Sequence, residues 1–129
     1  MTTVQQFAWV AAGGGLGASA RFAFNLWLGR FSMPLATFAV NVLGCIALGF
    51  LVHWFAVRDF AWWQDSGRLL LATGFCGAFT TMSALALEVS VLADKGQSGL
   101  AIGFALATLV ASCIGLLGGI SLARATLGA

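Results

Sequence analysis

Residues 73–83 read TGFCGAFTTMS and interrupt what would otherwise be an ordinary membrane helix. They lie inside a long apolar segment, Leu69 to Leu92. The two glycines lower helix stability, and the adjacent Thr80 and Thr81 are both β-branched residues with hydroxyl groups. In a bilayer, backbone that leaves the helix is tolerated only where protein buries it or where water or ions reach it. We therefore expect the helix to break here, and the break to mark a functional site.

The composition predicts a membrane protein. The chain has 129 residues, of which 60% are hydrophobic and 8% charged, and this length predicts a single domain with no extramembrane module. A signal peptide is not expected, because the first residues carry no basic side chain. The net charge of +2 is small and scattered, so it favours neither a nucleic-acid partner nor a polybasic lipid-binding patch. The run of glycines near residue 14 lacks the phosphate-loop pattern and no strand precedes it, which argues against nucleotide binding.

Four apolar segments are long enough to cross a bilayer, for which about 20 residues are needed. We expect an all-α fold in which these four transmembrane helices form one domain over residues 1–129, with the third helix broken near its middle. The connections between the segments are short. The expected helices are roughly 7–28, 35–57, 69–93 and 99–122.

The basic residues give almost no instruction about orientation. Four spans leave both termini on one side of the membrane, and basic residues occur on both sides in nearly equal numbers. One interpretation is that a single strong span sets the topology regardless. The other is that the chain inserts in both orientations and pairs as an antiparallel homodimer, which suits a protein too small to form a pathway alone. The residues counted are Arg58, Arg68 and Arg124 on one side, and Arg30 and Lys95, with Arg21 nearby, on the other.

Glycine pairs spaced four residues apart predict close helix packing. They are Gly13/Gly17, Gly99/Gly103 and Gly115/Gly119. In lipid, such smooth faces let helix backbones approach one another closely.

The side chains that usually carry catalysis or bind metals form no recognisable group. Cys45, Cys76 and Cys113 lie in three different segments without metal-ligand spacing, and we interpret them as buried, inert thiols. Of the four acidic residues, three fall in connections, and no serine, histidine and acid set is suitably placed. We therefore do not expect an enzyme.

Several polar side chains fall within the apolar segments and need an explanation. Arg21 either reaches the interface with its long stem or provides a fixed positive charge that attracts anions to a vestibule. Asn41 serves either as a hydrogen-bonding residue between helices or as an amide donor for an anion. Glu88 is a functional candidate by its depth, unless it is protonated and hydrogen-bonded. Thr108 and Ser112 share one helix face, where they either bond back to carbonyls or line a polar track together with Ser83 and Glu88.

Three motifs resemble the small fluoride channels of bacteria, the Fluc or CrcB family. Residues 14–21, GGLGASAR, match the family pattern Gly-Gly-x-x-Gly-Ala-x-x-Arg with its spacing compressed by one. Residues 36–44, ATFAVNVLG, match Gly-Thr-Leu-x-Val-Asn-x-x-Gly with Ala36 in place of glycine. Residues 74–85 match the long and rare pattern Gly-Phe-Cys-Gly-Gly-x-Thr-Thr-Phe-Ser-Thr-Phe. The resemblance covers essentially the whole chain.

This resemblance implies a passive fluoride-selective channel that exports cytoplasmic fluoride across the bacterial inner membrane and relieves fluoride toxicity. It implies a multi-pass, dual-topology homodimer with two pores. It also implies a structural Na⁺ ion at the dimer interface, where the two broken helices cross. The family's ligands are backbone carbonyls, which correspond here to Gly77 and Thr80 of both subunits. Fluoride, a second copy of the chain and the lipid bilayer are then its partners.

The resemblance also assigns residues to the fluoride pathway. Asn41 corresponds to the family's pore asparagine and Arg21 to its vestibule arginine. Ser83, Glu88 and Thr108 fall on its polar track, which Ser112 continues, and Phe104 falls where the family often has a tyrosine. The main departure is at two pore phenylalanines, whose positive ring edges face the anion. Met82 and Leu85 stand at those positions, so the chemistry of this part of the pore differs from the family's.

Two other functions fit parts of the sequence. Proton-coupled small multidrug-type exporters are also four-helix antiparallel dimers, but they need a carboxylate in the first helix, whereas the only spanning acid here is Glu88. A non-conducting membrane scaffold subunit is the remaining alternative, because the phenylalanine pair is absent.

Overall fold

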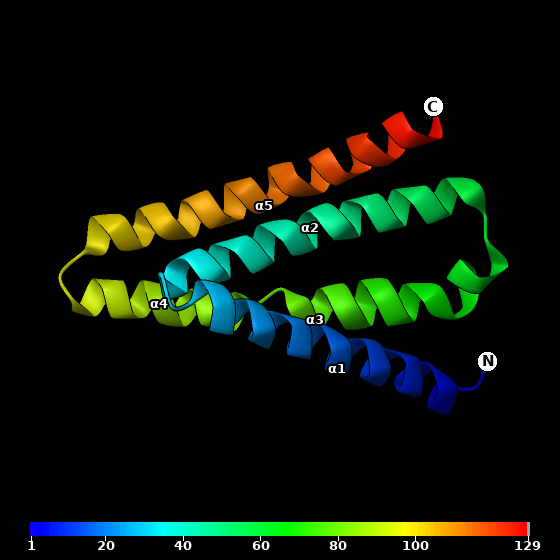
Figure 1. Cartoon of the computed structure of the whole chain (residues 1–129), viewed down its shortest axis with the longest axis horizontal. Coiled ribbons are helices and arrows are strands. Elements are labelled where there is room, and N and C mark those ends of the chain that lie inside the picture. Colours follow the sequence, from blue (N-terminus) through cyan, green and yellow to red (C-terminus); the bar gives the residue numbers. More distant parts are fainter. Residues whose placement is uncertain (129) are drawn as a thin grey trace.

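The computed structural model describes residues 1–128, the side chain of Met33 excepted, and over this range the chain is helical with short connections (Figure 1). The third predicted helix is present as three consecutive pieces, which together form one broken helix. The elements are α1 (Thr3–Leu28), α2 (Met33–Arg58), η1 (Trp63–Cys76), α3 (Gly77–Phe79), α4 (Met82–Asp94) and α5 (Ser98–Leu127). The first of the three pieces, η1, is wound as a π-helix, which has a wider turn than the α-helix.

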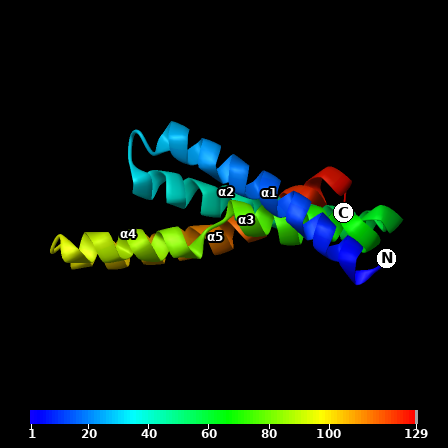
Figure 2. The same cartoon turned by 90° about the horizontal axis from the view of Figure 1, so that it is seen from below.

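The helices run back and forth along the long axis of the molecule, so both termini lie at the same end (Figure 1). The connection between α1 and α2 and the connection between α4 and α5 lie at the opposite end, where Figure 2 shows them well apart. Helices α2 and α5 pack side by side along much of their length, and α1 packs against η1 and α3. The broken helix therefore lies between the α1 side and the α2–α5 pair.

The helices extend further than the apolar segments from which they were predicted. Helix α1 begins at Thr3 instead of near residue 7, because Thr2 and Gln5 form a capping box. Helix α2 ends at Arg58, because the next residue, Asp59, adopts a left-handed conformation with φ of 48°. Hydropathy marks only the apolar part of each helix, whereas capping side chains decide where the helix begins and ends.

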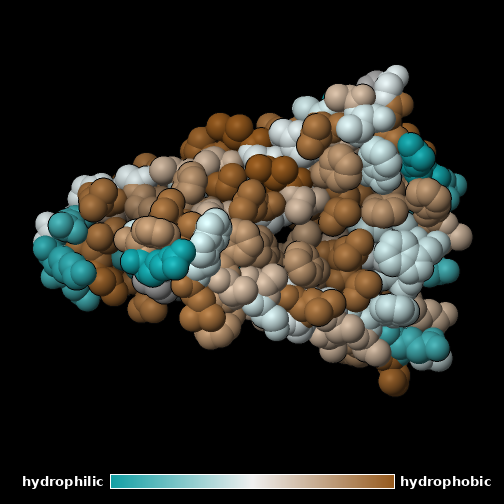
Figure 3. Space-filling model, viewed as in Figure 1, coloured by the Kyte–Doolittle hydropathy of each residue, from teal (hydrophilic) through white to brown (hydrophobic). Residues whose placement is uncertain are grey.

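Three helical stretches in the described part of the chain are long and apolar enough to cross a membrane, namely Pro34–Arg58, Trp63–Asp94 and Ser98–Leu127. The expectation of four spans is thus supported in part. Helix α1 has the length of a span, at 26 residues, but it contains Gln5, Gln6, Arg21 and Asn25, which lower its hydropathy. Figure 3 shows hydrophilic residues gathered mainly toward the two ends of the molecule and hydrophobic residues over its middle, as expected for helices that span a bilayer.

Two of the three predicted glycine pairs lie where helix backbones meet. A Cβ atom at Gly13 or Gly17 would overlap the backbone carbonyl of Leu70 or Phe75 in η1. A Cβ atom at Gly119 of α5 would overlap the Ile46 carbonyl of α2, and one at Gly115 would lie in tight contact, 3.1 Å from the Ile46 side chain and 3.2 Å from the Val42 carbonyl. In the third pair, a Cβ atom added at Gly99 or Gly103 would meet no atom of the described residues within 4 Å, so the predicted packing role of this pair within the chain is not realised. Close backbone approach therefore fixes α1 against η1 and α5 against α2.

Candidate functional site

The broken helix opens at Thr80 and Thr81, both of which have extended backbone conformations. The Thr80 N–H still donates to the Cys76 carbonyl at 3.1 Å, and the Thr80 hydroxyl donates to the same oxygen at 3.0 Å. Helix α4 then begins anew, with the Thr81 hydroxyl accepting a hydrogen bond from the Ala84 N–H at 3.2 Å. The predicted break is thus confirmed, and the Thr81 side chain caps the start of α4.

Asn41 of α2 bridges this break with both ends of its side-chain amide. Its Oδ1 accepts a hydrogen bond from the Thr81 N–H at 2.8 Å, and its Nδ2 donates to the Thr81 carbonyl at 3.1 Å. Both residues are buried, with 9% of Asn41 and 6% of Thr81 exposed. The amide therefore takes the place of the partner that a continuous helix would give the Thr81 N–H, and it retains a second N–H on Nδ2.

The same hydrogen bonds release two backbone carbonyls from the helix. In a continuous helix, the Thr81 N–H would donate to the Gly77 carbonyl and the Ala84 N–H to the Thr80 carbonyl. Here these donors are taken by the side chains of Asn41 and Thr81. Carbonyl oxygens without a helical partner at membrane depth require another partner, either from protein or from an ion.

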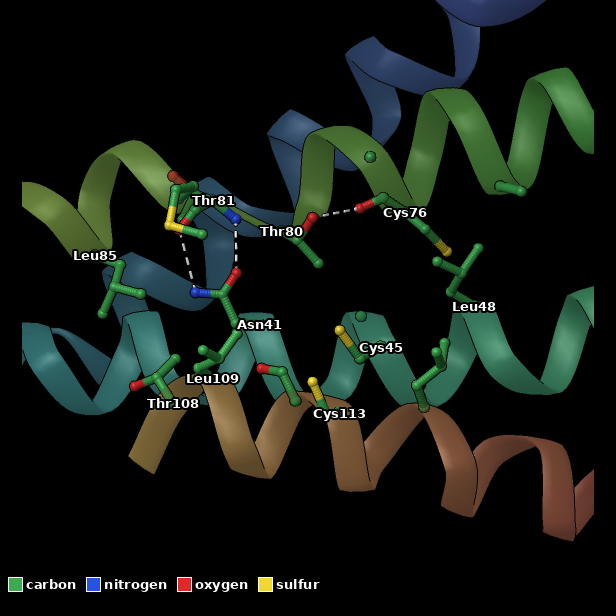
Figure 4. A pocket seen from close by; sticks show the side chains of 16 residues that line it. Asn41, Cys45, Leu48, Cys76, Thr80, Thr81, Leu85, Thr108, Leu109 and Cys113 are labelled. Atoms are coloured by element: carbon green, nitrogen blue, oxygen red, sulfur yellow. Dashed lines mark hydrogen bonds between the residues drawn. The ribbon is translucent and has the colours of Figure 1, made fainter. Parts of the chain in front are cut away.

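A cavity of about 350 Å³ lies beside the break, between the broken helix and the α2–α5 pair (Figure 4). Its walls are mostly apolar, with a few polar side chains among them. The buried Thr108 hydroxyl on α5 is 1% exposed and has no hydrogen-bond partner among the described residues. An unpaired buried hydroxyl is costly, so this group is a feature of the site that requires an explanation.

Most of the predicted site residues meet at this cavity, and four do not. The lining includes Asn41, Met82, Leu85, Thr108 and Ser112, together with Gly77 and Thr80. Arg21, Ser83, Glu88 and Phe104 lie outside the lining. Ser83 nevertheless lies close to the break, because its hydroxyl shares a hydrogen bond of 3.3 Å with that of Thr81.

Glu88 of α4 pairs with Thr37 of α2, which was not among the predicted site residues. The Thr37 hydroxyl donates to Glu88 Oε1 at 2.7 Å, while the buried Oε2 has no partner among the described residues. Thr37 is 2% exposed and lies four residues before Asn41, hence on the same face of α2. The four-residue spacing between Thr37 and Asn41 is visible in the sequence, and it is the signal that could have identified Thr37.

The two residues that the family resemblance places at the pore phenylalanine positions differ sharply in exposure. Met82 is 71% exposed, whereas Leu85 is 8% exposed, and both contribute to the cavity lining. Met82 therefore projects outward at the start of α4, while Leu85 forms part of the apolar wall. A thioether is polarizable but lacks the ring quadrupole of phenylalanine.

Comparison with known proteins agrees with the motifs around this site. Residues 8–120 match the family described as CrcB-like protein, Camphor Resistance (CrcB). The chain belongs to the CrcB-like family. The matched range contains the break, Asn41 and all three helices around the cavity.

Curated relatives cover nearly the whole chain. A Paracoccus denitrificans protein named "Fluoride-specific ion channel FluC" is 38% identical over 120 residues, which is 92% of this chain and 94% of that protein. A Prosthecochloris aestuarii protein of the same name is 40% identical over 117 residues, or 89% of this chain and 90% of its own length. Family membership and several long apolar helices together make this a multi-pass membrane protein.

Proposed function

We propose that this chain is a passive fluoride-selective channel, and not an enzyme, that exports cytoplasmic fluoride across the bacterial inner membrane. The observation that carries the proposal is a cavity at membrane depth that is lined by Asn41 and by Thr108, a threonine whose buried hydroxyl has no partner among the described residues. The names of the relatives, fluoride-specific ion channels at 36–40% identity, support the same conclusion.

Hydrogen-bond donors at this depth suit fluoride in particular. Fluoride is small and holds its water tightly, so a narrow pathway must replace that water with other donors. The hydroxyls of Thr108 and Ser112 and the second N–H of Asn41 are such donors, and none of them carries a negative charge. In this proposal Ser83 and Glu88 extend the polar route beyond the cavity. Phe104 of α5 lines this outer part of the route, and Arg21 attracts anions to the mouth of the route.

Two copies of the chain, inserted in opposite orientations, form the working channel in this proposal. The support is the exposed backbone at the break: Gly77 is exposed on the cavity side, in the middle of an apolar stretch. Lipid does not satisfy such backbone, whereas a second broken helix lying across it does. All four helices then span the membrane, including α1, and each dimer holds two fluoride pores.

A structural Na⁺ ion fits the released carbonyls. Gly77 and Thr80 both line the cavity, and both have lost the N–H donors that a helix would provide. Oxygen ligands suit a hard cation, so the two carbonyls from each of the two chains would hold Na⁺ between the crossing helices. The ion would supply positive charge that neutralises the exposed carbonyl dipoles and ties the two chains together.

Fluoride flux from liposomes tests the proposal. Purified chain reconstituted into fluoride-loaded vesicles should release fluoride when the electrical potential is collapsed with valinomycin, while chloride-loaded vesicles retain their anion. Flux no greater than from empty liposomes would support the scaffold alternative, and proton-coupled drug transport that depends on Glu88 would support the exporter. Replacing Na⁺ by a larger monovalent cation throughout purification should weaken dimer assembly or flux, and indifference to the cation would contradict the carbonyl site.

A further inference from the structure

All three thiols of the chain line the same cavity, although they come from three separate helices. Cys45 lies on α2, Cys76 ends η1 and Cys113 lies on α5. The thioether of Met82 joins them, so the cavity gathers four of the six sulfur-containing side chains, three cysteines and three methionines in all. Figure 4 shows the sulfur atoms of Cys45 and Cys113 projecting from the α2–α5 side, with Cys76 on the opposite side.

Cys45 and Cys113 form the most accessible pair. Both are free thiols, Cys45 half-buried and Cys113 exposed, whereas Cys76 is buried with 2% of its surface exposed. The thiols of Cys45 and Cys113 project from α2 and α5, which pack side by side, and both line the same cavity. The sequence interpretation of three buried, inert thiols therefore holds for burial only at Cys76.

The arrangement restricts the kind of metal ion that the thiols can bind. Within the described residues, no three histidine, cysteine, aspartate or glutamate side chains converge closely enough to hold one ion. Zinc sites use four ligands, or three with an open position, so this cavity does not provide one. Soft ions such as Hg²⁺, Ag⁺ and Cu⁺ favour sulfur and are satisfied by two thiolates, which Cys45 and Cys113 can supply.

We propose that Cys45 and Cys113 form a two-thiol binding site for a soft, thiophilic metal ion. For Hg²⁺, two mercury–sulfur bonds form, two sulfur–hydrogen bonds break and two protons are released, with no change in oxidation state. The bound ion occupies the cavity next to Asn41 and Thr108. If the proposed fluoride function is correct, on which this consequence rests, the ion blocks the anion route.

Mass spectrometry of the purified full chain tests the site without reference to fluoride. After reaction with one equivalent of HgCl₂ in detergent, we expect one mercury per chain that replaces two protons and retains no chloride. Cys113→Ser should lose this bridged product and carry mercury with chloride still attached, while Cys76→Ser, the matched control, should keep it. Chloride-bearing mercury on separate thiols of the wild type, mercury that links two chains, or loss of the bridge in Cys76→Ser would each overturn the proposal.

A flux measurement then separates this site from the proposed function. We expect HgCl₂ to abolish fluoride release from liposomes that contain the wild type and to leave release unchanged in Cys45→Ser/Cys113→Ser. A bridged mercury product without any fluoride release before its addition would refute the channel and leave the metal site intact. Equal inhibition of the wild type and the double variant would refute the block at this site.

Discussion

Replacing Asn41 with alanine should destabilise the fold. The change removes two hydrogen bonds at once, one to the Thr81 N–H and one to the Thr81 carbonyl. Thr81 is 6% exposed, so its backbone groups have no water to replace the lost partners. The Thr81 N–H would remain unsatisfied at the point where the helix is already open, whereas the Thr81 carbonyl, at the N-cap of α4, keeps the first hydrogen bond of that helix.

The expected cost follows from one unsatisfied donor and one further lost hydrogen bond. A buried donor left without a partner costs about 1–3 kcal/mol and a lost hydrogen bond about 0.5–1.5 kcal/mol, so the two together cost about 1.5–4.5 kcal/mol. Alanine has a higher helix propensity than asparagine, which offsets less than about 1 kcal/mol of this. The free energy of unfolding should therefore fall by several kcal/mol, a large part of the stability of a small domain.

Asn25→Ala is the matched control. Asn25 also lies in a long helix, and its side chain makes no hydrogen bond within the described residues. The helix-propensity change is the same in both variants, so the difference between them isolates the two hydrogen bonds. Unfolding by sodium dodecyl sulfate in mixed micelles, followed by fluorescence of the five tryptophans, gives the two free energies. Equal values for Asn41→Ala and Asn25→Ala would refute the role of the amide, whereas failure of Asn41→Ala alone to fold would support it.

Three further predictions concern the pathway and the packing. Asn41→Asp should suppress fluoride flux in liposomes about tenfold or more, because the added negative charge repels the anion. A barrier raised by ~1.4 kcal/mol is enough for a tenfold effect. Unchanged flux would show that Asn41 is not part of the pathway. Gly13→Ala should lower the free energy of unfolding by about 1–3 kcal/mol, because its Cβ overlaps the Leu70 carbonyl, whereas Gly14→Ala, with no atom within 4 Å, should not. Met82→Phe should raise fluoride flux by adding a ring edge at this exposed position, and flux equal to the wild type would argue that Met82 lies off the route.

Much of the fold was predictable from local chemistry. The apolar segments predicted the helices, because only a helix or a closed barrel satisfies the backbone in lipid. The break was predictable for a similar reason, since glycines and adjacent threonines weaken the helix at one place. The spacing of Gly13 and Gly17 predicted a close approach of backbones, but not that η1 would be the partner.

The candidate site was only partly predictable. Asn41 was selected as a polar residue at membrane depth, but its bridging of the break depends on α2 lying against Thr81, 40 residues further along the chain. Thr37 was overlooked because a threonine in an apolar helix usually bonds to its own backbone, whereas here its hydroxyl donates to Glu88 on α4. The shared cavity of the three cysteines has no signature in sequence spacing, since each thiol lies on a different helix.

Hydropathy and residue type alone thus determined that this is a helical membrane chain with an opened third helix, because the bilayer enforces backbone hydrogen bonding locally. Tertiary structure decided that Asn41 of α2 takes the Thr81 N–H, which in a continuous helix would donate to the Gly77 carbonyl. It also decided that the Thr108 hydroxyl is buried without a partner beside the same cavity. Such features arise from contacts between distant segments, which no local pattern encodes.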